Sequence, residues 1–130
     1  MNQEEIDLRD QLVLLLNRES MDLISTHESL SFPVIARIFK KMKIGLQFGA
    51  IQVVDNAIID GHHRFVAAQL ANYSLDRIQG IRSLAKVNYE WQTVQFIDVD
   101  WDTAAKVEML NKMDARLNNI TLDELLARIA

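Results

Sequence analysis

Apolar residues recur along the chain at spacings that predict helices in its first third. Residues 4–16 carry acidic residues in the opening turn and then a heptad-like apolar pattern, which predicts an amino-terminal helix with a packing role. A second helix is expected between Pro33 and Gly45. Proline suits the first turn of a helix and glycine suits its end, so these two residues mark its limits.

Helix-capping residues mark the carboxy-terminal part of the chain, about residues 102–130, for which two helices are expected. Asp100 or Asp102 is the expected cap of the first of them. Thr121 and Glu124 form a capping box in front of an amphipathic pattern, which predicts a short closing helix. This helix is expected to dock on the core or on a partner.

A strand pattern occupies the middle of the chain. Residues 51–59 predict a β-hairpin or a bent strand, because apolar residues flank Asp55-Asn56, two residue types that tolerate turn conformations. Residues 65–71 return to helical apolar spacing, so the hairpin leads directly into a helix. Two further strands are expected at residues 86–89 and 94–99, where their pairing would brace the hairpin and the helix.

Two segments, one before the hairpin and one after its helix, have no regular pattern. The first contains His27 and Glu28, which could enter a site from a loop as a titratable pair. Nothing in their spacing links them to Arg64, so a place outside the site is favoured. The second contains Arg77 and Arg82, which could face phosphate, although exposed arginines on connections are usually only solvated.

Size and composition fit one compact domain that spans residues 1–130. The 130 residues are 49% hydrophobic, enough to bury a real core. Nothing at the start resembles a signal peptide, and the longest apolar run there, residues 12–16, is too short to cross a bilayer. A soluble protein with no membrane partner is therefore expected. The absence of cysteine excludes a disulfide framework, and it fits both a reducing cytoplasm and a chain that must unfold for export.

Basic residues are concentrated at one place in a chain of net charge −4. With 14 basic and 18 acidic residues, the chain cannot hold nucleic acid through bulk positive charge, so any such contact must be local. Arg37, Lys40, Lys41 and Lys43 lie within the second predicted helix, and the first three are expected to share its outer face. They could contact a nucleic-acid backbone or simply form a solvated helix face.

The strongest chemical signal is the run Asp60-Gly61-His62-His63-Arg64, where the hairpin meets the helix. Gly61 allows close backbone approach, and the N–H groups of the first helical turn together with Arg64 suit a phosphate group. Asp60 could cap the turn, orient a histidine or hold a divalent metal. His62 and His63 offer acid–base or ligand nitrogens, and they point about 100° apart on a helix, which suits one catalytic and one structural histidine.

The same run also has an ordinary interpretation. An Asp-Gly turn before a helix is common, and a single histidine is more often a surface or core residue than a ligand. Four polar side chains around one glycine, all between apolar segments, nevertheless favour a functional site.

This run, with Ala67, Ala68 and Leu70 after it, resembles the signature of the ParB/sulfiredoxin superfamily. The resemblance extends to the preceding hairpin and helix, and it covers about residues 33–75. It implies an α+β fold, a small mixed sheet flanked by helices, in which the helix amino terminus and Arg64 hold the phosphate of a nucleotide or nucleic acid. Members of the superfamily include nucleases, nucleotide switches and phosphotransferases, so the fold alone does not determine the reaction.

Two features separate the chain from the better-known members of that superfamily. The absence of cysteine excludes sulfinic-acid repair, which needs a thiol. The 66 residues after Arg64 leave little room for the helix-turn-helix region of chromosome-partitioning members. The double histidine most resembles the ParB-like nuclease domains, including those that form toxin modules at the ends of large secreted bacterial proteins.

The leading hypothesis from the sequence is therefore phosphodiester cleavage of nucleic acid. Arg64 and Gly61 would clamp the phosphate, and His62 or His63 would act as general acid or base. Asp60 would orient that histidine or bind Mg²⁺. The site of action would be a cytoplasm. A toxin module would be delivered there by secretion, and a cognate inhibitor protein would cover the Arg64 cleft.

Two other hypotheses stay open at this point. In the first, the cluster holds the phosphates of ATP or CTP, or takes part in phosphotransfer, and no nucleic acid is cut. The acidic balance of the chain favours this alternative somewhat. In the second, the chain is an interaction module without catalysis.

Overall fold

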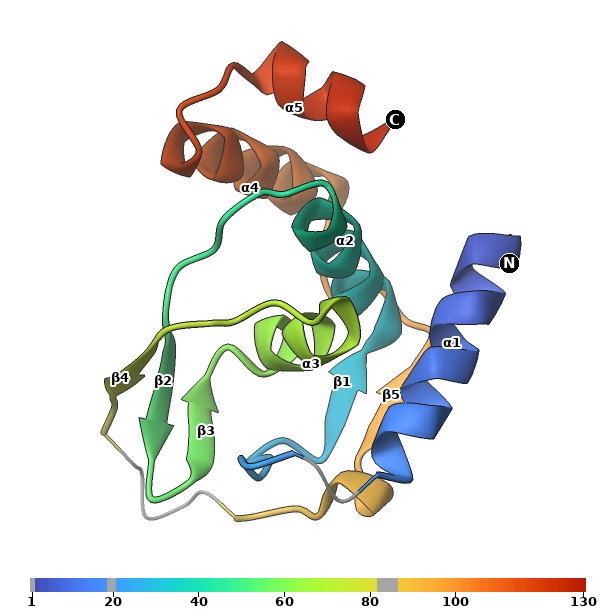
Figure 1. The fold of residues 1–130 in the computed structure, drawn as a ribbon, viewed down its shortest axis with the longest axis vertical. Coiled ribbons are helices and arrows are strands. Elements are labelled where there is room, and N and C mark those ends of the chain that lie inside the picture. The colour runs from blue at the N-terminus through green and yellow to red at the C-terminus, as the bar shows by residue number, and fades with distance from the viewer. Residues whose placement is uncertain (1, 19–20, 82–86) are drawn as a thin grey trace.

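The structure, a computed structural model, describes residues 2–18, 21–81 and 87–130 (Figure 1). Within these ranges the chain alternates helices with short strands. The helices are α1 (Gln3–Leu16), α2 (Phe32–Lys43), α3 (His62–Ala71), α4 (Ala104–Leu117), α5 (Leu122–Ile129) and a 3₁₀ turn, η1 (Trp91–Thr93). The strands are β1 (Ser29–Ser31), β2 (Ile51–Val54), β3 (Ala57–Asp60), β4 (Arg77–Gln79) and β5 (Gln95–Ile97).

The strands form two small sheets. The three-stranded sheet has the order β3-β2-β4, with β2 antiparallel to β3 and parallel to β4, so it is mixed. A separate parallel pair joins β1 to β5. Figure 1 shows α3 between the three-stranded sheet and the β1–β5 pair, with α1 along the outside of that pair. The predicted α+β class, with a small mixed sheet flanked by helices, is confirmed.

Of the two forms expected for residues 51–59, the hairpin with its turn is confirmed. Asp55 and Asn56 connect β2 to β3 with φ angles of +48° and +66°. Two successive positive φ angles are the geometry of a type I′ turn, whose twist matches that of the paired strands. The hairpin therefore delivers Asp60, the last residue of β3, directly to the start of α3.

Most of the core lies around α3. Phe65, Val66, Ala67 and Ala68 of this helix are each 2% exposed or less. They belong to one apolar cluster with residues from α1, α2, both sheets and the η1 region. The α1 residues of this cluster confirm the packing role expected for residues 4–16; they are Leu8, Leu12 and Leu15.

The carboxy-terminal helices α4 and α5 form a hairpin at one end of the molecule (Figure 1). A second, smaller cluster of Leu46, Ala115 and Leu125 joins them to the segment after α2. The closing helix therefore docks on this cluster, one of the two expected positions. Among the described residues, no helix combines the length and apolar character needed to cross a bilayer.

Helix ends match the predicted signals in three of four cases. Thr121 Oγ1 accepts from Glu124 N at 3.0 Å, as a capping box requires, and Pro33 lies in the first turn of α2. Gly45, with φ +93°, follows α2 at its carboxy-terminal end. For α4 the prediction was wrong, because Thr103 and not an aspartate is the N-cap.

The strand predictions after α3 were only partly correct. The strand expected at residues 94–99 is present but shorter, as β5. In place of the strand expected at residues 86–89, Tyr89 makes a single bridge to Ser25. Lys86 and Arg82 lie outside the residues that the structure describes. Strands β1 and β4 were not predicted from the sequence. Each has only three residues, too few to show an alternating pattern.

Candidate functional site

The five residues Asp60 to Arg64 line a pocket of about 650 Å³. The pocket is bordered by α2, by the first turn of α3 and by one face of α4. The structure thus brings the predicted cluster together in one cavity. The wall that α4 contributes was not expected from the sequence.

The first turn of α3 is open at its amino-terminal end. Its N-cap is Gly61, with φ +99°, and no side chain caps the turn. A Cβ at this position would collide with Ile51 Cγ2 and approach Arg64 Nη2 to 3.0 Å, so glycine is required both by the backbone angle and by the space. Asp60 does not have the capping role that was one of its expected functions. The helix amino terminus carries a partial positive charge at the border of the pocket.

Arg64 is held at the edge of the pocket by three hydrogen bonds. Nη1 donates to the carbonyl oxygens of Gly49 and Ala50 at 3.1 and 3.2 Å, and Nη2 donates to Asp60 Oδ2 at 3.2 Å. The Arg64 side chain is 25% exposed, and that of Asp60 is 65% exposed. The guanidinium is therefore fixed in position while part of it stays accessible from the pocket.

His62 holds the segment before β1 against α3. The imidazole is 2% exposed, and its Nε2 accepts a hydrogen bond from Thr26 N at 3.0 Å. The Thr26 hydroxyl lies 3.2 Å from the same nitrogen and donates to the carbonyl of Ile58 at 2.6 Å. A ring nitrogen that accepts an N–H carries no proton, so Nε2 is the unprotonated nitrogen of this ring. This geometry gives His62 a structural role.

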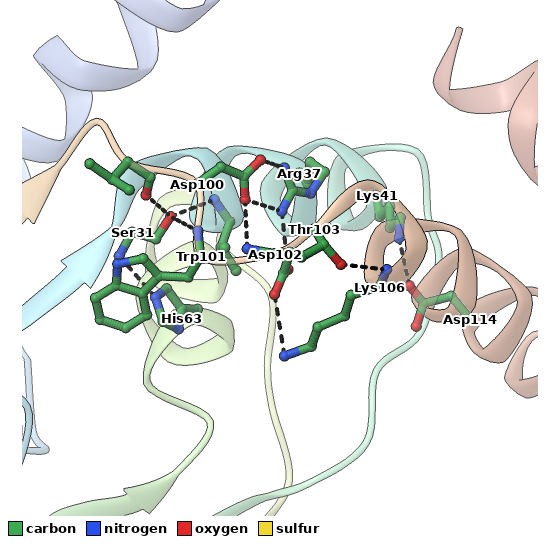
Figure 2. Close-up of polar contacts among 12 residues, drawn as sticks. Ser31, Arg37, Lys41, His63, Asp100, Trp101, Asp102, Thr103, Lys106 and Asp114 are labelled. Carbon is green, nitrogen blue, oxygen red and sulfur yellow. Dashed lines mark hydrogen bonds and ion pairs between the residues drawn. The ribbon is translucent and has the colours of Figure 1, made fainter.

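His63 makes the equivalent contact one position further along the helix. Its Nε2 accepts from Ser31 N at 3.0 Å, and its ring meets that of Trp101 edge-on at a centroid distance of 5.1 Å (Figure 2). Burial, and after it the charge of His27, lowers the pKa of His63 from 6.5 to about 4. His63 is therefore neutral at pH 7, with Nε2 engaged by the backbone.

His27 joins the site, although a place outside it was favoured from the sequence. Its ring stacks on that of His62 at 3.9 Å with an interplanar angle of 22°, and it lines the pocket. Glu28 is exposed and does not line the pocket. The link from Thr26 to His62 spans 36 residues, so no local spacing could have indicated the position of His27.

The guanidinium of Arg37 is not a free, solvated charge, because it is paired with two carboxylates. It donates to Asp100 at 2.5 and 2.9 Å and to Asp102 at 3.0 Å. The bond to Asp100 raises the pKa of Arg37, and the bond from Arg37 lowers the pKa of Asp100 from 3.8 to about 2. These ion pairs explain why neither aspartate caps α4. They join α2 to the segment before α4 (Figure 2).

Lys41 lies under α4 and not on an outer face of α2. It is 6% exposed, and its Nζ lies 2.7 Å from Asp114 Oδ2. The expected outer face shared by Arg37, Lys40 and Lys41 is therefore wrong for Lys41, because α4 covers that side of α2. Lys40 is exposed and does not line the pocket.

The charges that line the pocket are nearly balanced. The cations are Arg37, Lys41, Arg64 and Lys106, and the carboxylates are Asp60, Asp102 and Asp114. Four cations against three carboxylates leave a formal balance of +1 with the histidines neutral. In the part of the chain that the structure describes, no group of three or more His, Asp or Glu residues could hold a metal ion.

Comparison with protein-family models, with curated proteins and with solved structures found no match to this chain. The resemblance to the ParB/sulfiredoxin superfamily therefore stays a prediction from the residues that carry it. No relative assigns a family or an activity to the chain.

Proposed function

We propose that the pocket binds the phosphate groups of a nucleotide at the amino-terminal end of α3. The observation that carries this proposal is the pairing of an uncapped helix start at Gly61 with the fixed guanidinium of Arg64. A helix amino terminus acts as roughly half a positive charge, and a guanidinium matches phosphate oxygens with two parallel donors. Both elements line the same pocket.

The histidine contacts favour binding over cleavage. The Nε2 atoms of His62 and His63 accept backbone N–H groups of Thr26 and Ser31. A histidine that acts in general acid–base catalysis needs a nitrogen within reach of the substrate and a pKa near the working pH. His63, with a pKa of about 4, does not meet the second condition. Nucleotide binding requires neither condition.

Mg²⁺ fits this proposal only together with the nucleotide. Magnesium in nucleotide sites is commonly bound by one or two carboxylates and by the phosphates themselves. Asp60 is 65% exposed and lies 3.2 Å from Arg64 Nη2, so its carboxylate would be the protein ligand nearest to bound phosphates. Phosphates at Arg64 would compete with Asp60 for the guanidinium, and a bound cation would reduce the resulting repulsion.

Thermal unfolding with millimolar ATP or CTP, with and without Mg²⁺, tests the proposal. A ligand at 100 times its Kd stabilises the folded state by about 2.7 kcal/mol, which raises the Tm measurably. Arg64→Ala should cancel the increase and Arg64→Lys should retain part of it. Arg116→Ala should behave like the wild type, because Arg116 is exposed and lies outside the pocket.

Each variant is compared with its own Tm without ligand, because Arg64 also bonds to Gly49 and Ala50. A wild-type Tm that no nucleotide changes would reject the proposal. An increase that survives in Arg64→Ala would reject the assignment to α3.

A second candidate is phosphodiester cleavage of nucleic acid, and one observation favours it. His27 brings a third imidazole into the pocket, beside His62. In this candidate Arg64 would clamp the scissile phosphate. A toxin module delivered by secretion would require a cognate inhibitor that covers the pocket.

Incubation of the protein with plasmid DNA and total RNA, with and without Mg²⁺, tests this candidate. Cleavage that is lost in both Arg64→Ala and His27→Ala would support it. Nucleic acid left intact by the wild type under all four conditions would reject it.

A further inference from the structure

The pocket extends well beyond the phosphate end of α3. Its volume of about 650 Å³ lies within the range of sites that hold a whole small ligand, and a phosphate group alone would fill only a small part of it. We infer that the pocket is a two-part site, in which α3 holds the phosphates and an apolar wall of α4 holds the nucleobase. This inference rests on the proposed function and names the part of the ligand that the remaining space would take.

The apolar wall is one face of α4. Four apolar residues of α4 line the pocket, and their spacing of three or four residues places them on the same side of the helix; they are Val107, Leu110, Met113 and Leu117. Two charged residues of α4, Lys106 and Asp114, line the pocket beside them. Phe48 lines the pocket as well. A ligand with its phosphates at Arg64 would therefore have apolar protein surface beside its remaining part.

Two residues of this wall are uncovered. Met113 is 54% exposed and Leu117 is 55% exposed, although both border a pocket. A thioether is polarisable and adapts to flat aromatic surfaces, so Met113 suits contact with a planar base. The occupant is assigned as a nucleobase because Arg64 and the start of α3 suit a phosphorylated ligand, while Met113 suits contact with a planar base.

The wall is held in place before any ligand binds. Two ion pairs hold α4 to α2: Lys41 pairs with Asp114, which lies within α4, and Arg37 pairs with Asp102, which lies just before it (Figure 2). After α4, Asn118 bonds to both the N–H and the carbonyl of Gln47, at 2.7 and 3.1 Å. A preformed wall reduces the ordering cost of binding.

A matched pair of double variants tests the wall without disturbing the core. Met113→Gln/Leu117→Gln changes two exposed residues that line the pocket. Met109→Gln/Leu126→Gln changes one exposed methionine and one exposed leucine of the same helical hairpin, 50% and 41% exposed, that do not line it. Calorimetric titration with ATP, with CTP and with inorganic triphosphate, at equal Mg²⁺, then compares ligands with and without a base.

We expect ATP or CTP to bind the wild type at least tenfold more tightly than inorganic triphosphate. The pocket double variant should lose about tenfold in nucleotide affinity and change its triphosphate affinity less than twofold, while the control double variant should match the wild type. If inorganic triphosphate binds as tightly as both nucleotides, the claim that the α4 wall binds the nucleobase is overturned, but the proposed function still stands. The absence of binding by all three ligands would reject the proposed function itself.

A second comparison, of geranyl diphosphate with ADP, tests whether the wall binds a hydrocarbon chain or a nucleobase, because both ligands carry a diphosphate. Tighter binding of geranyl diphosphate, lost in the pocket double variant, would show that the wall takes a hydrocarbon chain and would overturn the nucleobase assignment. Tighter binding of ADP would support it.

Discussion

The Nε2 atom of His63 accepts a hydrogen bond from the backbone N–H of Ser31 at 3.0 Å. Ser31 is also the N-cap of α2, and its hydroxyl donates to the carbonyl of Val99 at 2.8 Å. One histidine contact thus links α3 to the start of α2 and to the segment before α4 (Figure 2). With the parallel bond from Thr26 to His62, it makes the double histidine a structural part of the site.

Stability should fall as the pH is lowered from 6.5 towards 4. The folded pKa of His63 is about 4, below its ordinary value of 6.5, so the unfolded chain binds more protons in that range. The contribution of neutral His63 to the free energy of unfolding is complete above pH 6.5. It is lost as the pH approaches 4, at up to about 1.4 kcal/mol per pH unit. Urea unfolding at pH 7, 6 and 5 measures it. His63→Gln, which keeps an acceptor for Ser31, should show a shallower loss; equal slopes would contradict the assignment.

Replacement of His62 should destabilise the fold. His62→Ala removes the acceptor of Thr26 N and leaves a buried N–H unpaired, in addition to a cavity at a residue that is 2% exposed. The expected loss is about 2–4 kcal/mol in the free energy of unfolding. His62→Gln should recover part of this loss because it can restore an acceptor. Hydrogen exchange at the Thr26 amide reports the same bond, and unchanged protection in His62→Ala would contradict it.

Two glycines with similar backbone angles should respond differently to alanine. Gly45→Ala, at φ +93°, meets no atom within 4 Å, so it should cost only the left-handed strain of about 1–2 kcal/mol. Gly61→Ala, at φ +99°, adds a collision with Ile51 and should cost at least about 2 kcal/mol more than Gly45→Ala. Denaturant unfolding of both variants gives the difference, and equal losses would show that the space around Gly61 is not tight.

The ion pair between Lys41 and Asp114 should be strongly coupled. Asp114→Leu leaves a lysine that is 6% exposed without its partner, with an expected loss near the lower end of the about 3–5 kcal/mol typical of buried pairs. The double variant Lys41→Met/Asp114→Leu should return to within about 1 kcal/mol of the wild type. Glu108→Ala, which breaks an exposed pair with Lys112, should cost less than about 1 kcal/mol. Additive losses at Lys41 and Asp114 would contradict the coupling.

Local signals in the sequence were sufficient where structure depends on neighbouring residues. The turn at Asp55 and Asn56, the capping box at Thr121 and the helix end at Gly45 each follow from a few adjacent residue types. The same holds for the start of α3 after Gly61. These features locate the hairpin and the helix that carry the predicted site.

Contacts between segments that are distant in the sequence could not be predicted from such local signals. Asp100 and Asp102 have the residue type of helix caps, but they bind Arg37 at sequence separations of 63 and 65. Lys41 has the pattern of an outer-face residue, and only the position of α4 shows that it is covered. The stacking of His27 on His62 likewise depends on a contact across the fold.

Titration of ¹⁵N-labelled protein with ATP or CTP, followed by two-dimensional NMR, tests the central claim most directly. Binding of phosphate at the start of α3 should shift the amide signals of Gly61, His63 and Arg64 in a saturable manner, and the Arg64→Ala variant should not show these shifts. The exposed α5 residue Arg128 serves as an internal reference that should not move. Nucleotide-induced shifts confined to other parts of the protein, or none at millimolar nucleotide, would contradict the assignment of this pocket to nucleotide phosphate.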